Sequence, residues 1–125
     1  MNFLPGTVRR EGGAARIELA GGATVPLPAG SAGAEGQGVI FGTRPEHLML
    51  ADGSPGDDGG SIAVQVVTVE PTGADTFVAC RHQGTEMAAV FRERHDFTPG
   101  STIHLRPDLQ RAHVFDAATG LRLAA

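Results

Sequence analysis

One stretch, residues 61–80, constrains the fold more than any other part of the chain. Apolar β-branched residues alternate with polar ones from Ile62 to Val66, and this alternation is typical of a half-buried strand. Apolar groups then fall on the opposite face at Val67 and Val69. This switch predicts a strand that either bends or is covered on both sides, as in a small barrel.

A polar corner joins the two halves of this stretch. Pro71 has no backbone N–H to donate to a strand ladder, so strand pairing is predicted to stop near Glu70. Gly73 accepts backbone angles that other residues resist, which predicts a turn. Apolar residues resume after Thr76 and continue to Cys80, which predicts a second strand.

The rest of the chain repeats this pattern of short apolar runs and turn residues. Its 125 residues include 18 glycines and 8 prolines but only 6 phenylalanines and no tryptophan or tyrosine, a balance that favours short strands over long helices. The pattern predicts a single all-β domain, residues 1–125, built as a barrel or sandwich of about nine to eleven short strands. Strands are expected at residues 6–11, 14–20, 23–28, 39–43, 49–50, 62–70, 76–80, 86–91, 101–106, 114–116 and 121–123.

Four segments interrupt these strands. Pro45 suits the first position of a helix, so residues 44–48 are predicted to form a short helical turn. Residues 107–111 are predicted to form a turn or a second helical turn. The composition of residues 29–38 predicts a flexible loop, and residues 52–60 form an acidic, glycine-rich segment that predicts a long surface loop.

Charge and composition exclude several classes of function. The net charge of −4 provides no basic footprint for nucleic acid. All ten basic residues are arginine, which removes a phosphate-loop lysine and a Schiff-base lysine together. The single cysteine cannot form an internal disulfide, and no apolar run approaches the ~20 residues that span a bilayer. These features predict a soluble, cytoplasmic domain.

No combination of residues predicts a catalytic or metal site. The histidines have neither a ligand spacing nor a cysteine pair beside them, and Cys80 lies in an apolar strand where a buried structural thiol is expected. The glycines between residues 30 and 42 lack the ending of a phosphate-binding loop. The five histidines are His47, His82, His95, His104 and His113.

Two further features concern the ends of predicted strands. Arg44 and Glu46 flank Pro45, and they are expected to form a partly buried ion pair or to cap backbone groups rather than to bind a ligand. Phe3 and Leu4 are large apolar residues at the start of the chain, so both are expected to need burial.

Four segments occur in an order that is familiar from one family. They are MNFLPG at the start, GTRPEHL at residues 42–48, VVTVEPTGADTFV at residues 66–78 and HVFDAATGLRL at residues 113–123. Together they make the chain resemble the C-terminal regulatory domain of ATP-binding subunits in carbohydrate ABC importers, of the maltose and glycerol-3-phosphate type. The resemblance covers nearly the whole chain.

The resemblance implies a fold, a place in a larger protein and several partners. It implies an OB-like barrel of the transport-associated (TOBE) type, as a C-terminal piece of a subunit whose ATPase domain is absent from this chain. ATP and Mg²⁺ would bind in that absent domain, so this chain would have no cofactor and no catalytic residue of its own. The family's domain pairs with its copy, receives regulatory proteins and reaches the inner face of the membrane through permease subunits.

The residues that match the family's motifs are few. Arg44, Pro45, Glu46 and His47 match its Arg-Pro-Glu-His motif, which is interpreted as structural. The corner residues Glu70, Gly73 and Asp75 match the part that in relatives lies toward the dimer or regulatory contact. The closing turn matches at Phe115, Asp116 and Gly120.

Two other functions remain as alternatives. One is a small-oxyanion or sugar-phosphate binding barrel, with Arg44, Arg81 and Arg106 as candidate ligands. The other is a barrel for single-stranded nucleic acid. The acidic charge and the absence of tyrosine and tryptophan disfavour that function, because such barrels stack bases on aromatic residues.

Overall fold

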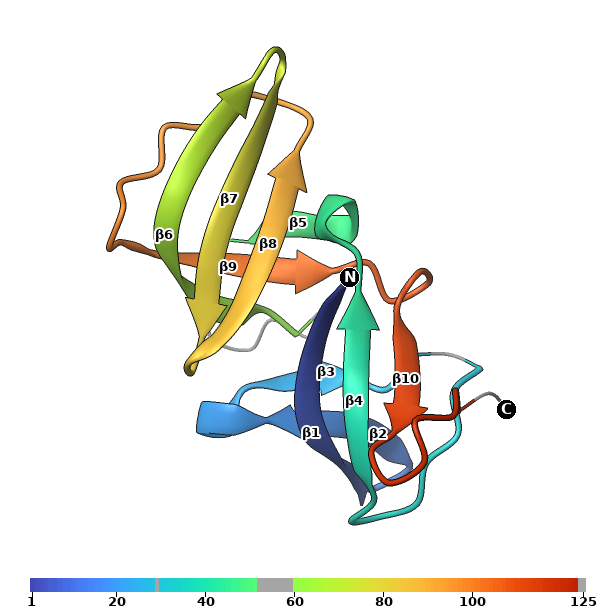
Figure 1. Ribbon diagram of the computed structural model, residues 1–125. Coiled ribbons are helices and arrows are strands. Elements are labelled where there is room, and N and C mark those ends of the chain that lie inside the picture. Colours follow the sequence, from blue (N-terminus) through green and yellow to red (C-terminus); the bar gives the residue numbers. More distant parts are fainter. Residues whose placement is uncertain (29, 52–59, 124–125) are drawn as a thin grey trace.

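The chain folds into two five-stranded antiparallel sheets, which lie one above the other in Figure 1. This computed structural model describes residues 1–28, 30–51 and 60–123, so residues 52–59 of the predicted surface loop lie outside the described residues. Ten strands are present in the described part, and the all-β prediction is confirmed. They are β1 (Asn2–Glu11), β2 (Ala14–Leu19), β3 (Thr24–Pro26), β4 (Gly38–Thr43), β5 (Leu48–Ala51), β6 (Ile62–Thr72), β7 (Asp75–His82), β8 (Thr85–Phe91), β9 (Thr102–Pro107) and β10 (His113–Asp116).

The first sheet has the strand order β10-β4-β1-β2-β3. The Gly12-Gly13 pair, with positive φ at both positions, closes the predicted hairpin between β1 and β2. Strand β3 ends at Pro26 and lies at the edge of the sheet, as its prolines predict. Strand β1 begins at Asn2, several residues earlier than the sequence pattern predicts, because Asn2–Thr7 pair with β4.

The second sheet has the order β5-β9-β6-β7-β8 and contains the central stretch. The pairing register of β6 and β7 shifts between Val66 and Thr68, so a β-bulge turns Val67 outward and confirms the predicted bend. The prediction that pairing stops near Glu70 is wrong, because Pro71 and Thr72 still pair with β7. Strand β9 pairs with β6 only at residues 62–65, so the proline lies where β6 has a single neighbour, and there a missing donor is tolerated.

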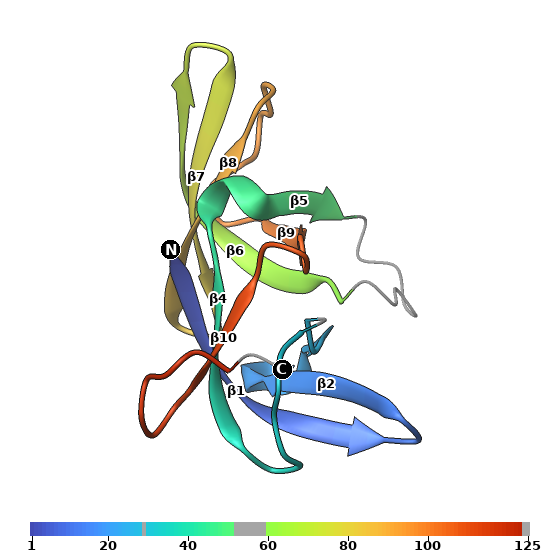
Figure 2. The same cartoon turned by 90° about the vertical axis from the view of Figure 1, so that its right-hand side faces the viewer.

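The helical parts are two 3₁₀ turns, η1 (Ala20–Gly22) and η2 (Pro45–His47). The second confirms the helical turn predicted after Pro45, and it packs beside β8 so that the sheet curls toward a barrel (Figure 2). Of residues 107–111, Pro107 still belongs to β9 and residues 109–110 form a turn rather than a helical turn. The last predicted strand, 121–123, is reduced to one bridge between Phe115 and Arg122. No helical segment in the described ranges has the length and apolarity needed to cross a bilayer.

The inward faces of both sheets contribute to one apolar cluster. Phe41 is the largest of its fully buried side chains, and it lies between Leu4 of β1 and Val114 of β10 in the sheet register. Val78 and Leu105 of the second sheet belong to the same cluster. Because one cluster spans both sheets, burial of apolar surface holds them against each other.

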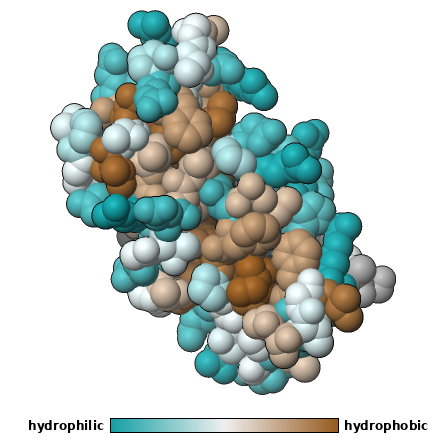
Figure 3. Space-filling model, in the orientation of Figure 1, coloured by the Kyte–Doolittle hydropathy of each residue, from teal (hydrophilic) through white to brown (hydrophobic). Residues whose placement is uncertain are grey.

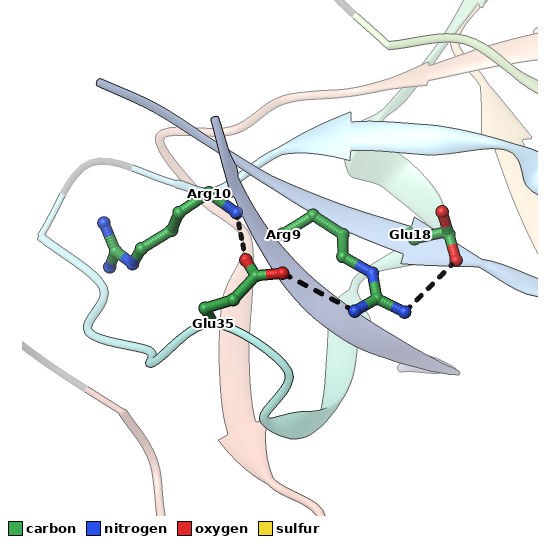
Figure 4. Close-up of polar contacts among 4 residues, drawn as sticks. All are labelled: Arg9, Arg10, Glu18 and Glu35. Atoms are coloured by element: carbon green, nitrogen blue, oxygen red, sulfur yellow. Dashed lines mark hydrogen bonds and ion pairs between the residues drawn. The ribbon is translucent and has the colours of Figure 1, made fainter. Parts of the chain in front are cut away.

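Loop residues 30–37 are fixed to the first sheet, although their composition predicts flexibility. Glu35 accepts a hydrogen bond from the Arg10 backbone N–H, and its other oxygen lies 3.6 Å from the Arg9 guanidinium (Figure 4). Arg9 also lies 3.8 Å from Glu18 of β2, and Arg10 donates from Nε to the Gly33 carbonyl at 2.7 Å. These contacts give the arginines of β1 a structural role.

Asn2 joins the two sheets through hydrogen bonds. Its buried amide donates to the Ala88 carbonyl of β8 at 2.8 Å, and its Oδ1 accepts from the Ala88 N–H at 2.8 Å. The Asn2 side chain therefore provides hydrogen-bond partners for the backbone N–H and C=O of an edge strand, as a neighbouring strand would.

We expect Asn2→Leu to lower the free energy of unfolding by about 1–3 kcal/mol, because it leaves both Ala88 backbone groups without these partners. Urea unfolding followed by circular dichroism measures this loss. Asn2→Asp keeps the acceptor and removes only the donor, so it serves as the matched control. A leucine variant as stable as the wild type would show that the link contributes nothing.

Candidate interaction surfaces

The described residues contain no obvious reactive centre. No group of three or more His, Cys, Asp or Glu side chains in this part of the chain is arranged to hold a metal ion. His82 is buried, with Nδ1 3.1 Å from the Ala63 carbonyl, which fits a structural role.

Cys80 is buried within β7, as the sequence predicts. Burial raises the pKa of its thiol to about 11. A shift of that size lowers the reactive thiolate fraction at pH 8 by about a hundredfold relative to an exposed cysteine. Cys80 is therefore unsuited to act as a nucleophile.

This burial predicts that Cys80 of the folded chain resists Ellman's reagent at pH 8 and reacts at once in guanidinium. Because the folded-state pKa lies above the unfolded one, the free energy of unfolding is also expected to fall as the pH rises from the ordinary thiol value toward 11. Cys80→Ala serves as the control for the pH series. Rapid labelling under native conditions would contradict the buried placement.

The Arg-Pro-Glu-His motif forms η2 at the junction of β4 and β5. Arg44 is the residue before the turn, and its carbonyl accepts a hydrogen bond from the His47 N–H at 3.0 Å. The Arg44 and Glu46 side chains are both exposed, so the expectation of a partly buried pair is wrong. A backbone hydrogen bond lowers the Glu46 pKa, and the nearby positive charges of His47 and Arg44 act in the same direction. This arrangement supports a local backbone role.

The predicted contact corner lies at the far end of the β6–β7 hairpin, at the top of Figure 1. Glu70 and Gly73 are exposed, and Gly73 has φ of +65° in the turn. The Asp75 carboxylate lies 3.1 Å from the Arg92 guanidinium just beyond β8. The corner is therefore a projecting hairpin end, and Asp75 ties it to the segment that follows β8.

That following segment contains an aromatic stack that the sequence pattern did not reveal. The His95 ring stacks on Phe97, with centroids 5.0 Å apart, and meets the Phe91 ring edge-on at 5.1 Å. Its backbone N–H donates to Thr76 Oγ1 at 3.2 Å. Residues 92–96 are charged apart from His95, and His95 is anchored beside the corner.

The closing Phe-Asp-x-x-x-Gly motif forms a tight turn after β10. Asp116 accepts hydrogen bonds from the Thr119 hydroxyl at 2.8 Å and from the Gln37 amide at 3.2 Å, and these bonds lower its pKa. Gly120, with φ of +75°, donates from its N–H to the Asp116 carbonyl at 2.7 Å. Asp116 therefore has a structural role, whereas Phe115 points outward.

The three arginines proposed for an oxyanion site do not share one place in the fold. Arg81 pairs with Gln65 in the β6–β7 register, and Gln65 pairs with Thr102 of β9. Arg106 lies four residues beyond Thr102, which is about 13 Å along an extended strand. Arg44 lies outside both sheets, between the end of β4 and η2. No convergent anion site is formed by this set.

The face seen in Figure 3 carries two apolar areas, one over each sheet. Over the second sheet, a hollow of about 380 Å³ is lined in part by Val67, Phe77 and Ala79. Over the first sheet, a hollow of about 360 Å³ is lined by Phe3, Ile40, Phe115 and Gly120.

Phe3 is 53% exposed, so the expectation that it needs burial is wrong, whereas Leu4 is buried. The alternation of side chains along a strand is the signal that separates these two residues. Because neighbouring residues of a strand face opposite sides, only one residue of the Phe3-Leu4 pair can reach the core.

Two domain families match the sequence. The MalK OB fold domain matches residues 1–48, and the TOBE domain matches residues 41–115. The two matches together cover residues 1–115, which contain three of the four segments that carried the resemblance and the start of the fourth, and they confirm both the family and the OB-like fold expected from it.

Relatives of known name are ATP-binding proteins. The uncharacterized ABC transporter ATP-binding protein y4oS of Sinorhizobium fredii is 40% identical over 124 residues, which is 99% of this chain and 31% of that protein. The sn-glycerol-3-phosphate import ATP-binding protein UgpC of Chromohalobacter salexigens is 39% identical over 119 residues, 94% of this chain and 30% of that protein. The chain thus spans about a third of the length of the curated relatives it matches.

A solved structure shares the fold. The cytoplasmic molybdate-binding protein ModG superposes with a TM-score of 0.67 at 18% identity, over 90% of this chain and 94% of that one. This likeness concerns the fold alone. The chain belongs to the TOBE domain family, and it is a domain of the kind found in ABC transporter ATP-binding subunits such as UgpC.

Proposed function

We propose that this chain is the C-terminal regulatory and dimerisation domain of the ATP-binding subunit of an ABC importer for glycerol 3-phosphate or sugars. The observation that carries the proposal is the pair of family matches, supported by relatives named for glycerol-3-phosphate import. In the whole subunit, the part outside this chain binds ATP and Mg²⁺ and performs hydrolysis. Permease subunits hold the assembly at the cytoplasmic face of the membrane.

Dimerisation has a simple mechanical purpose in such a subunit. Two nucleotide-binding domains must separate and meet again in each cycle. A second, lasting contact makes the reunion intramolecular, with an effective concentration in the millimolar range for a short linker. A rigid sheet domain suits this tethering role.

The projecting corner of the β6–β7 hairpin is the proposed pairing surface. Glu70 and Gly73 are exposed there, and Glu70 pairs in register with Phe77. Phe77 lines the apolar hollow of the second sheet together with the outward-turned Val67. A polar rim beside an apolar centre is the usual composition of a protein interface, and a two-fold axis would bring the same patch of both copies together.

Sedimentation velocity over a range of concentrations tests the pairing. The wild-type chain is expected to change from monomer to dimer as concentration rises into the high micromolar range. Glu70→Arg should weaken the association, because it replaces an acid by a cation where the copy presents the Arg92 guanidinium beside its own corner. Glu11→Arg, an exposed acid beside the turn of the β1–β2 hairpin, is the matched control and should associate as the wild type does.

A strict monomer at the highest concentration would refute autonomous pairing by this chain. Equal weakening by Glu70→Arg and Glu11→Arg would instead show that net charge, rather than the corner, controls association. Either result leaves the family assignment unchanged, because that assignment rests on the sequence matches.

Oxyanion binding is the second candidate, and one observation favours it. ModG, which shares the fold, is described as a molybdate-binding protein. The separation of Arg44, Arg81 and Arg106 argues against a site of this kind here. Calorimetry with molybdate, phosphate and glycerol 3-phosphate is expected to give no binding heat, and saturable heat with any of them would revive the candidate.

A further inference from the structure

Every proline within a described strand lies where that strand has only one neighbour. Pro5 of β1 pairs with β4 alone, because β2 joins β1 only further along the strand. Pro107 of β9 pairs with β5 alone, because β6 pairs with β9 only at residues 102–105. Pro26 belongs to the edge strand β3, and Pro71 lies on β6 beyond the reach of β9. The prolines therefore mark the parts of these strands that no second strand covers.

The backbone nitrogen of Pro71 faces the uncovered side of β6. Residues 73–74 form a two-residue turn, and such a turn closes on a pair that exchanges hydrogen bonds, here Thr72 and Asp75. Hydrogen-bonding directions alternate along an antiparallel strand, so Thr72 bonds toward β7 and the residue before it does not. Pro71, and with it Val69, therefore directs its backbone groups away from β7.

The uncovered stretch, residues 67–72, is called here the open edge of β6. It begins just after Val66, whose N–H and C=O bond to Ser101 and Gly100 at 2.8 Å each. All of its residues are exposed except Val69, which is partly buried, and it forms one side of the projecting hairpin (Figure 1). An edge of this kind is a template for pairing with another strand, because its outward N–H and C=O groups lack a ladder partner.

A second copy of the open edge is the partner that would match it best. Two copies related by a two-fold axis present the same edge in antiparallel directions, so each donor meets an acceptor of the other copy. In that pairing, position 69 of one copy would exchange hydrogen bonds with position 71 of the other. Pro71 has no N–H for this exchange, and its ring Cδ occupies the space that the partner's carbonyl oxygen needs.

We propose that Pro71 keeps the open edge of β6 from pairing with the same edge of a second copy. The β-bulge between Val66 and Thr68 acts in the same direction, because it increases the local twist at the other end of the edge. This inference goes beyond the proposed function, since it concerns a contact that the hairpin avoids. Two copies that meet at the Glu70 corner then do so through side chains and not by extending a sheet.

Turn chemistry does not account for this proline. Prolines are favoured at the first central position of a turn, which here is Gly73. Pro71 instead pairs in register with Thr76 inside the ladder, where prolines are depleted. The same placement on an uncovered strand edge recurs at the other strand prolines, and this recurrence favours a role at the edge.

Pro71→Val tests the proposal, because it restores the outward N–H and introduces a residue that strands favour. In sedimentation velocity, this variant is expected to self-associate at concentrations at least about tenfold below those that the wild-type chain requires. Pro71→Thr restores the same N–H with a polar side chain and is expected to behave alike. It serves as the second variant should the valine variant not fold, and circular dichroism verifies the fold of each.

Thr72→Val is the matched control. It places the same side chain one residue further along, where the backbone bonds toward β7, so it adds no donor to the open edge. This control should associate as the wild type does. Amide hydrogen exchange followed by NMR locates the new contact: in Pro71→Val the amide of Val69 is expected to exchange at least about tenfold more slowly once the chain associates.

Three results would overturn the proposal. One is association of Pro71→Val and Pro71→Thr at wild-type concentrations, and another is an equal gain in Thr72→Val, which would assign the effect to apolar side chains. The third is stronger association without slower exchange at Val69, which would place the contact elsewhere. A wild-type chain that stays monomeric would refute the proposed pairing at the Glu70 corner but not this inference, because association of the Pro71 variants alone would still support it.

Discussion

Phe41→Ala is expected to lower the free energy of unfolding by about 3–5 kcal/mol. Phe41 is fully buried on β4, where Leu4 and Val114 flank it on the neighbouring strands. Truncation removes the ring from the centre of the first sheet and leaves a cavity, because three paired strands cannot collapse freely onto the vacated space. Guanidinium unfolding of the purified chain measures the loss.

Ile40→Ala is the matched control for this prediction. Ile40 is the preceding residue of the same strand, but it points outward and is partly exposed. Its truncation is expected to lower the free energy of unfolding by well under half of the loss expected for Phe41→Ala. If both variants lost the same stability, the assignment of the inward and outward faces of β4 would be wrong.

Gly60→Ala is expected to lower the free energy of unfolding by about 2–5 kcal/mol, because backbone strain and steric overlap both act against an alanine at this position. Gly60 has φ of +71°, which an alanine resists. A Cβ at this position would lie 2.8 Å from Pro26 Cδ, 2.9 Å from Val25 Cα and 3.0 Å from the Thr24 carbonyl oxygen. Because two of these three atoms belong to the backbone, β3 itself would have to move.

Gly12→Ala separates the two contributions to that cost. Gly12 also has a positive φ, of +56°, but apart from its two chain neighbours no residue has an atom within 4 Å of the Cβ position. Its substitution therefore reports strain alone, about 1–2 kcal/mol. The difference between the two variants in urea unfolding measures the close approach of Gly60 to β3. Equal losses of unfolding free energy in the two variants would show that the close approach of Gly60 to β3 adds nothing to the effect of backbone strain.

The sequence predicted the strands well wherever local pattern decides them. The change of apolar face between Val66 and Val67 is the signature of a β-bulge, and the structure has one there. The prediction that Pro71 ends the pairing of β6 failed, because a proline interrupts pairing only on the side where its missing N–H would face a neighbouring strand. Whether β6 has a neighbour on that side depends on how far β9 extends. Tertiary pairing of this kind leaves no local trace in the sequence.

Surface features were harder to predict than strands. The position of Glu70 and Gly73 at a hairpin end followed from the turn chemistry alone. The contact between the Phe3 and Phe115 rings did not, because these residues are far apart in sequence and meet only through the pairing of β1 and β10 with β4. The anchoring of His95 against Phe97 likewise depends on Thr76 of another strand.

The most direct test of this account compares ATP hydrolysis by two purified proteins, the 125-residue chain and the whole subunit from the complete gene. If the proposed function holds, we expect Mg²⁺-dependent hydrolysis by the whole subunit and none by the chain. Hydrolysis by the chain itself, or a whole subunit that neither binds nor hydrolyses ATP, would contradict it.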